Sequence, residues 1–435
     1  MLNDTETPVK TGADTFTRLE SEVRSYCRSF PTVFRKAQNA TLTDIEGREY
    51  IDFLAGCASL NYGHNDPDMK SALVDYVMSD GVTHGLDMFT EAKEAFLISF
   101  SERILKPRGM DYRMMFQGPT GANAVEAALK LARKATGREN VIAFTNGYHG
   151  VTTGALAATG NGSQRAGSRS QLTGVTRMAY DGFHGDGIDS AQMLDDMLGD
   201  TSSGIDAPAA ILLECIQGEG GLNLASKEFL RRLRAIATKH GALLIIDEIQ
   251  AGCGRSGDFF AFEFAGIQPD IVTMAKSLSG YGLPFSMVLV KPEYDVFTPA
   301  EHNGTFRGNN HAFVTARAAL EKFWATEDFA LDIRRKAEFL NERLGGIATS
   351  FGDDFRVKGR GMMRGIDTGS GERAAAICAA AFERGLIIET AGSSNEIVKV
   401  LAPLTITDAV FARGLDILAD AFDAVLSEPS RIAAE

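Results

Sequence analysis

The chain has 435 residues, a formal charge of −13 and a hydrophobic share of 44%, as in a globular protein with one large core or two modest ones. Its acidity argues against binding to a nucleic-acid backbone, which requires a basic face. No apolar run approaches the ~20 residues that a membrane helix needs, the polar N-terminus does not resemble a secretory signal, and the five cysteines lack metal-binding or disulfide spacing. We therefore expect a cytoplasmic protein without nucleic-acid, membrane or metal partners.

The first 60 residues predict a helix over residues 17–30 and then a short hairpin with its turn at residues 44–47. From about residue 90 to 290, amphipathic stretches alternate with the apolar runs RMMFQ, NVIAFT, AAILLEC, ALLIIDE, DIVTMA and FSMVLV. Because apolar runs without alternation fit strands that are covered on both faces, this region predicts a parallel α/β sheet. Residues 311–435 predict a smaller α+β lobe. Ligands bind beyond the carboxyl ends of the strands in open α/β sheets, so the polar residues after each run are the candidate site.

A glycine-rich turn precedes a helical pattern within residues 116–137. Gly118, Pro119 and Gly121 interrupt regular structure, and Gly137 is a suitable helix stop. A helix that begins in this way presents free N–H groups and a positive dipole end to an anion such as phosphate. Neither the GxGxxG nor the GxxxxGK[ST] phosphate motif is present. A tight turn before a capped helix is the commoner explanation of such a segment taken alone.

Asp247 and Lys276 each follow an apolar run. A buried carboxylate needs a partner, and a cationic ring nitrogen would be one; a helix cap or a metal-binding acid is the alternative. A lysine in a desolvated position after a strand can form a Schiff base, whereas an ordinary surface lysine is the alternative. Lys291 also follows an apolar run, but Pro292 directly after it indicates a turn.

Two further segments carry candidate side chains. In NGYHG, Tyr148 can stack on an aromatic cofactor and His149 can form a hydrogen bond near it, although both can equally be structural. In HNGTFRGNNHA, Thr305 offers a hydroxyl group within what is otherwise a connecting loop. An anion cradle, a stacking aromatic, a carboxylate and a lysine together are the combination that an enzyme dependent on pyridoxal 5′-phosphate (PLP) uses.

With these motifs the chain resembles the class III aminotransferases of PLP fold type I over residues 30–410. The segments that carry the resemblance are YIDFLAG, NYGH, GPTGANAVEAALKLAR, NGYHG, LLECIQGEGG, LLIIDEIQAGCGRSG, AKSLSG and HNGTFRGN. The resemblance implies a large domain at residues 66–310, with a mostly parallel seven-stranded sheet between helices. It also implies a small α+β domain from residues 1–65 and 311–435, and a homodimer or dimer of dimers with shared active sites.

The resemblance further implies roles for individual residues. Lys276 would form the Schiff base with PLP and move a proton, and Asp247 would pair with the pyridine nitrogen. Contacts with the cofactor are implied for Gly121 and Ala122 at the phosphate, Tyr148 on the ring, His149 near it, Gln250 at the phenolic oxygen, and Thr305 at the phosphate of the neighbouring subunit.

Within the family, four segments resemble the diaminobutyrate–2-oxoglutarate aminotransferases of ectoine biosynthesis: FTRLESEVRSYCRSFPTVF, THGLDMFT, DIVTMAKSLSGYGLP and EHNGTFRGNNHAF. The resemblance implies transfer from L-glutamate to L-aspartate 4-semialdehyde, which gives L-2,4-diaminobutyrate and 2-oxoglutarate. The alternatives are a transaminase for another ω-amine (siderophore or antibiotic diaminobutyrate, ornithine, GABA or taurine), a semialdehyde aminomutase and a non-enzymatic binding protein.

Departures from ornithine-type relatives point away from an ornithine substrate. Val151 stands where those enzymes have an arginine that grips the substrate α-carboxylate, and two tyrosines of their pocket fall at Cys27 and Cys57. Glu219 matches the gate glutamate of the family, while Lys399 stands in place of its arginine partner. Lysine lacks the bidentate fork with which arginine holds a carboxylate. The expected substrate residues are therefore Glu219, Lys399 and Cys57.

Overall fold

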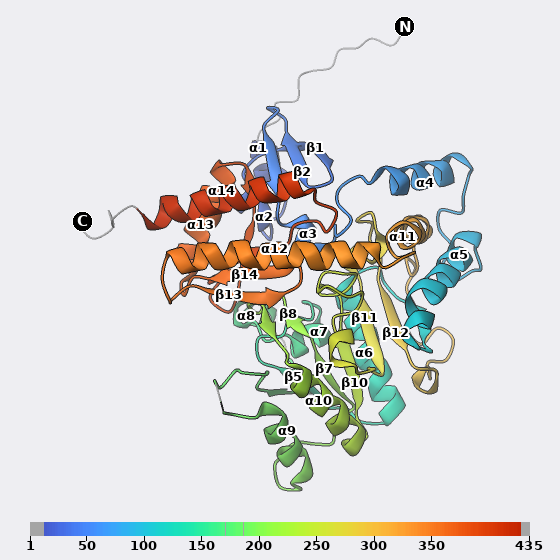
Figure 1. Ribbon diagram of the computed structural model, residues 1–435. Helices are drawn as coiled ribbons and strands as arrows, with labels where there is room; N and C mark the ends of the chain where they lie inside the picture. Colours follow the sequence, from blue (N-terminus) through green and yellow to red (C-terminus); the bar gives the residue numbers. More distant parts are fainter. Residues whose placement is uncertain (1–12, 170, 186, 428–435) are drawn as a thin grey trace.

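The computed structural model describes residues 13–169, 171–185 and 187–427 (Figure 1). The N-terminal part contains α1 (Ala13–Leu19), α2 (Tyr26–Ser29), β1 (Phe34–Gln38), β2 (Thr41–Asp44), β3 (Glu49–Asp52), α3 (Ala55–Ala58), α4 (Pro67–Met78) and α5 (Glu91–Phe100). The central part contains β4 (Arg113–Phe116), α6 (Gly121–Thr136), β5 (Val141–Phe144), α7 (Thr153–Ala158), α8 (Gly162–Ser168), β6 (Val175–Met178), α9 (Ser190–Gly199), β7 (Ala210–Leu213), β8 (Ile216–Gln217), β9 (Asn223–Leu224), α10 (Lys227–His240), β10 (Leu243–Asp247), β11 (Ile271–Met274) and β12 (Met287–Val290). The C-terminal part contains α11 (Asn310–Phe323), α12 (Asp328–Ser350), β13 (Arg356–Arg360), β14 (Met363–Asp367), α13 (Gly371–Glu383), β15 (Leu386–Ile387), β16 (Glu389–Ala391), β17 (Ile397–Val400) and α14 (Asp408–Leu426).

The central sheet has seven strands in the order β4-β12-β11-β10-β7-β5-β6. Its neighbours pair in parallel except at β12, which is antiparallel to both β11 and β4. The prediction of a mostly parallel seven-stranded sheet is therefore confirmed. The six apolar runs form six of the strands, and the seventh, β6, lies at an edge and is only partly buried.

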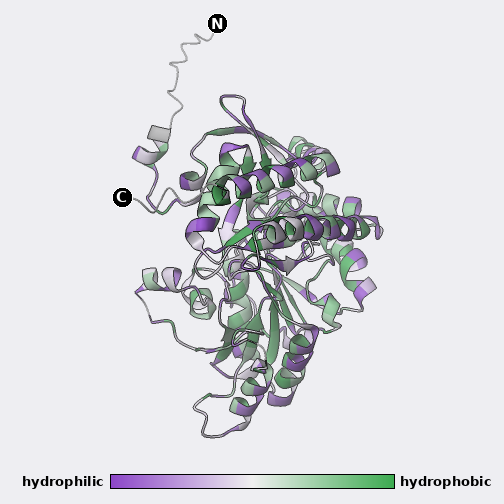
Figure 2. Cartoon of the chain, turned by 60° about the vertical axis from the view of Figure 1, so that its left-hand side comes forward, coloured by the Kyte–Doolittle hydropathy of each residue, from purple (hydrophilic) through white to green (hydrophobic). Residues whose placement is uncertain are grey.

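Helices cover both faces of this sheet because successive side chains of its strands point to opposite sides. On β10, Leu243 and Ile245 pack with the buried face of α6, while Leu244 and Ile246 pack with the buried residues of α10. Figure 2 shows the strands as hydrophobic and the covering helices as two-sided. This arrangement explains why the strands are apolar without alternation.

Two four-stranded sheets lie beside the large one (Figure 1). One has the order β13-β14-β17-β16, and the other has the order β1-β2-β3-β15, in which β15 pairs in parallel with β3. The N-terminal and C-terminal parts of the chain thus share one sheet. The prediction of a smaller α+β part is confirmed, and the structure shows that most of its strands pair antiparallel.

The N-terminal region differs from the sequence prediction in two ways. The helix expected over residues 17–30 is broken into α1 and α2, with a non-helical segment between them. The hairpin turn at residues 44–47 is present, but β2 is an additional strand that pairs with both β1 and β3. Among the described residues, no helix has both the length and the apolar character that crossing a membrane requires.

Candidate active site

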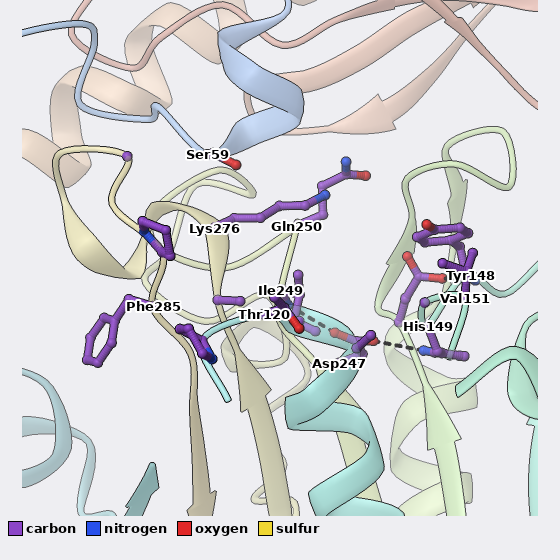
Figure 3. Close-up of a pocket in the computed structure, with 18 of the residues that line it drawn as sticks. Ser59, Thr120, Tyr148, His149, Val151, Asp247, Ile249, Gln250, Lys276 and Phe285 are labelled. Atoms are coloured by element: carbon purple, nitrogen blue, oxygen red, sulfur yellow. Dashed lines mark hydrogen bonds and ion pairs between the residues drawn. The ribbon is translucent and has the colours of Figure 1, made fainter. Parts of the chain in front are cut away.

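A cavity of about 370 Å³ lies at the carboxyl ends of the strands of the central sheet (Figure 3). Its walls come mainly from the segments that follow β4, β5, β7, β10 and β11. Seven of the residues predicted from the sequence line it: Gly121, Ala122, Tyr148, His149, Asp247, Gln250 and Lys276. Because they come from distant parts of the chain, the strand order is what brings them together.

Asp247 is the last residue of β10 and its side chain is buried. Oδ2 lies 2.8 Å from His149 Nδ1, while Oδ1 accepts hydrogen bonds from Thr273 Oγ1 at 3.1 Å and from the Ile249 backbone N–H at 3.1 Å. Although burial lowers the pKa of His149, the adjacent Asp247 carboxylate raises it above its usual value. The carboxylate is thus held in one orientation at the floor of the cavity.

Lys276 begins the short helix η4 (Lys276–Ser279), directly after β11 and Ala275. Its φ of +50° lies in the left-handed region, which costs a non-glycine residue of the order of 1 kcal/mol. Figure 3 shows the side chain reaching across the cavity to the side of Gln250. Strain of this kind is retained where the surroundings fix the residue for a task, which fits a reactive amine.

Helix α6 begins at the cavity with Gly121, and Thr120 is its N-cap. Thr120 Oγ1 accepts the Asn123 N–H, whereas the N–H groups of Gly121 and Ala122 belong to the first turn, which has no intrahelical acceptors. A Cβ atom on Gly121 would lie 3.1 Å from Ile249 Cδ1, so this position is closely packed against the second residue after Asp247. The helix start therefore offers an anion-binding site at one end of the cavity.

Tyr148 follows β5, and a buried carboxylate that the sequence analysis did not assign holds its backbone. Glu214 Oε2 accepts the Tyr148 N–H at 2.9 Å, and Oε1 accepts the Gly218 N–H at 3.3 Å. Burial raises the pKa of Glu214 to about 7, with the His149 charge opposing this rise and Asp247 adding to it. Its position at the end of the AAILLEC run was the sequence signal that could have identified it.

Glu219 and Lys399 form an ion pair of 2.9 Å beside the cavity. Gln250 Nε2 joins them by donating to Glu219 Oε1 at 3.0 Å, and it also donates to the Cys57 carbonyl at 3.3 Å. Burial alone would raise the pKa of Glu219, but Lys399 and Lys276 lower it to about 2. The structure thus brings Lys399 and the expected gate glutamate together.

Cys57 lies near this pair, but Cys27 does not. Cys27 is exposed, and its neighbour Tyr26 instead places its hydroxyl 2.7 Å from Cys57 Sγ. Tyr26, which keeps 49% of its surface exposed, rather than Cys27 therefore contacts Cys57. Glu389, which the sequence analysis missed, lies 3.9 Å from Cys57 Sγ and 3.0 Å from Lys399 Nζ.

Two remaining predicted positions differ in their placement. Val151 lines the cavity, and no arginine occurs among the described residues of its lining. Thr305 is exposed on the loop between β12 and α11 and does not line the cavity of its own chain.

The cavity residues fit PLP, the cofactor that the resemblance implies. The buried Gln250 Oε1 has no hydrogen-bond partner within the described part of the chain, so it can accept a donor from a ligand. The first N–H groups of α6 lack intrahelical acceptors and can bind a phosphate, and Asp247 presents an acceptor to a protonated ring nitrogen.

Comparison with known proteins agrees with this fit. The profile of the class III aminotransferase family matches residues 24–422. The diaminobutyrate–2-oxoglutarate transaminase of Halomonas elongata is 56% identical over 92% of this chain and 96% of its own length, and that of Vibrio parahaemolyticus is 53% identical over 95% and 98%. The crystal structure of ornithine aminotransferase from Toxoplasma gondii superposes with a TM-score of 0.84 at 28% identity, covering 97% of each chain.

A family profile that spans most of the sequence, relatives above 50% identity and a cavity that fits the cofactor lead to one conclusion. The chain belongs to the class III aminotransferases, and its cofactor is pyridoxal 5′-phosphate.

Proposed function

We propose that the protein transfers an amino group from L-glutamate to L-aspartate 4-semialdehyde, giving L-2,4-diaminobutyrate and 2-oxoglutarate. The observation that carries the proposal is the 51–56% identity, over more than nine tenths of the chain, to proteins named diaminobutyrate–2-oxoglutarate transaminase. The resemblance of the chain to the ectoine subgroup extends the proposal to ectoine biosynthesis in the cytoplasm.

Each residue of the cavity has a distinct part in this reaction. Bound PLP supplies a carbonyl that takes up the amine and a ring that withdraws electrons from the amine-bearing carbon. Lys276 Nζ holds the cofactor between turnovers and, once released, removes and returns the proton at that carbon. Asp247 keeps the ring nitrogen protonated, while His149 and Thr273 fix the orientation of its carboxylate. The first N–H groups of α6 bind the phosphate, and Tyr148 stacks on the ring.

Two positions distinguish this site from that of the ornithine-type relatives. Val151 offers no charge to the α-carboxylate of an ornithine-type substrate, and the gate position carries Lys399 instead of arginine. The remaining ω-amine transaminases are second candidates of the same chemical class, and an aminomutase would consume no keto acid.

A half-reaction screen tests the assignment. The PLP-loaded protein is mixed in turn with L-2,4-diaminobutyrate, ornithine, GABA, taurine and glutamate, and the visible absorbance of the cofactor is followed. We expect fast spectral change with diaminobutyrate and glutamate and slow change with the others. Fast change with ornithine or GABA alone would replace the proposed substrate, and turnover without consumption of a keto acid would indicate the aminomutase.

We also propose that two copies of the chain share their active sites. The segment from α4 to α5 exposes an apolar patch of Val77, Met78, Val82, Leu86, Met88 and Phe89, at an edge of the molecule in Figure 1. The Thr305 loop lies against it, since the rings of His84 and Phe306 are 5.1 Å apart and Arg307 is 3.7 Å from Asp87. Six exposed apolar residues in one segment support a protein interface. Across this interface, Thr305 would reach the phosphate of the PLP that is bound by the partner subunit.

A further inference from the structure

Lys399 lies between two carboxylates at the edge of the cavity. It is the residue on β17 directly opposite Glu389 on β16, and its Nζ is 3.0 Å from Glu389 Oε1 and 2.9 Å from Glu219 Oε1. Opposite charges in such cross-strand positions attract each other. One ammonium group is therefore shared by two carboxylates, and no second cation of the described residues lies at ion-pair distance from either of them.

Glu389 is the less compensated of the two carboxylates. Glu219 Oε1 accepts hydrogen bonds from both Lys399 and Gln250. Glu389 Oε1, although close to Lys399, has no hydrogen bond of acceptable geometry from any described residue, and Oε2 is met only by the Cys57 thiol at 3.9 Å. Burial raises the pKa of Glu389 and Lys399 opposes this rise, whereas the pKa of Glu219 is lowered to about 2. A further cation near Glu389 would thus be favourable.

Burial decides which of these charges a substrate can meet. The side chain of Lys399 is completely buried, while those of Glu389 and Glu219 keep 12% and 31% of their surface exposed. The accessible charge of this cluster beside the cavity is therefore negative. Such a wall suits a substrate ammonium group better than a substrate carboxylate. Gln250 connects this wall to the cavity, because it lines the cavity and donates a hydrogen bond to Glu219 Oε1.

We propose that Glu389 determines specificity by binding the second ammonium group of a diamino acid, the one that does not react. The proposal rests on the proposed function and names the residue that selects its substrate. L-2,4-diaminobutyrate and GABA differ only in the α-ammonium group of the former. With diaminobutyrate bound, two ammonium groups face two carboxylates, whereas GABA leaves Glu389 uncompensated.

The test compares these two amines in the wild-type protein and in Glu389→Gln, using kcat/KM of the amine half-reaction. We expect Glu389→Gln to lower kcat/KM for diaminobutyrate by about 10- to 100-fold, mainly through KM, because a charge-assisted hydrogen bond is lost. The value for GABA should change less than about threefold or should rise. The ratio between the two amines, which a general structural defect would not alter, is the deciding quantity.

Two further variants control the test. Glu383→Gln removes the same charge from an exposed position at the end of α13 and should leave the ratio unchanged. Glu389→Asp keeps the charge but shortens the side chain by one methylene, so its ratio of kcat/KM between diaminobutyrate and GABA should lie between those of wild type and Glu389→Gln. If Glu389→Gln does not fold, Glu389→Asp provides the test in its place. An equal loss for both amines, or an unchanged ratio in Glu389→Asp and Glu389→Gln, would overturn the role of Glu389 and leave the transaminase function standing. A wild-type protein that is inactive with diaminobutyrate and 2-oxoglutarate would overturn the proposed function and this inference with it.

Discussion

Lys276 combines a place after a buried strand, a left-handed backbone and a side chain that reaches across the cavity. If it holds PLP covalently, Lys276→Ala should lower turnover by at least about 10³-fold and make the cofactor removable by dialysis. Activity and the visible spectrum before and after dialysis measure both effects.

Lys291 provides the matched control for this prediction. It also follows a strand, but that strand, β12, is antiparallel to β11. Lys291 therefore lies at the opposite edge of the sheet from the cavity, where its Nζ pairs with Asp270 at 2.8 Å. Lys291→Ala should therefore retain turnover and cofactor. Retained activity in Lys276→Ala would contradict the assignment of Lys276 as the residue that binds PLP covalently.

Glu214 gives a prediction on pH dependence. Its pKa is raised to about 7 in the folded protein, while the unfolded chain titrates near the ordinary value of about 4.5. The folded state therefore binds more protons between these values, and the free energy of unfolding falls as pH rises from about 4.5 to 7. Glu214→Gln should flatten this fall by up to about 1.4 kcal/mol per pH unit in urea titrations. Glu228→Gln changes an exposed residue and should leave the pH dependence of the free energy of unfolding unchanged. If Glu214→Gln also leaves this dependence unchanged, the raised pKa of Glu214 is refuted.

These residues differ in how far the sequence could reveal them. Lys276 and Asp247 were found because each follows an apolar run, and a strand end is recognisable from local pattern alone. Glu389 follows a run as well, but its importance depends on its pairing with Lys399 and on the approach of Cys57. Neither contact has a local signal in the sequence.

Helices and strands likewise differ in whether their local sequence reveals them. The buried strands of the central sheet were predicted because both of their faces are covered, which makes their sequences continuously apolar. The edge strand β6 was missed because its residues VTRM are half-buried and lack that pattern. The helix expected over residues 17–30 is broken at residues 20–25, which are almost all exposed and therefore lack the buried face that stabilises a helix in a protein.

The start of α6 carries a prediction of its own. Gly121→Val would push side-chain atoms against Ile249, which a Cβ alone would already approach to 3.1 Å. We expect the affinity for PLP, measured by equilibrium dialysis, to fall about 10-fold or more because the phosphate contacts are displaced. Gly162→Val changes the first residue of α8, where a Cβ meets no atom within 4 Å, and should have no such effect. If Gly121→Val and the wild-type protein bind PLP with equal affinity, the start of α6 does not bind the phosphate.

The proposed dimer can be tested through its most exposed apolar residue. The Phe89 side chain is fully exposed in the single chain, so Phe89→Glu together with Met78→Glu should disrupt the interface. Light scattering should then report monomers, and PLP should be bound more weakly because Thr305 of the second copy is lost. Leu331→Glu alters an exposed leucine on α12 and should leave the assembly intact. A wild-type protein that is monomeric at micromolar concentration would contradict the proposal.

The domain limits at residues 65/66 and 310/311 stay a prediction. The pairing of β15 with β3 supports a small domain that is built from both parts of the chain, since this sheet joins residues more than 300 positions apart.

Local pattern was sufficient for the α/β class, the strand-end candidates and the resemblance to an aminotransferase family. These features depend on burial and turn chemistry, which each segment expresses in its own residues. The cluster of Lys399, Glu219, Glu389, Cys57 and Tyr26 became visible only in the folded chain. Its charge balance depends on distances between segments from both parts of the chain, and no segment contains those distances in its own sequence.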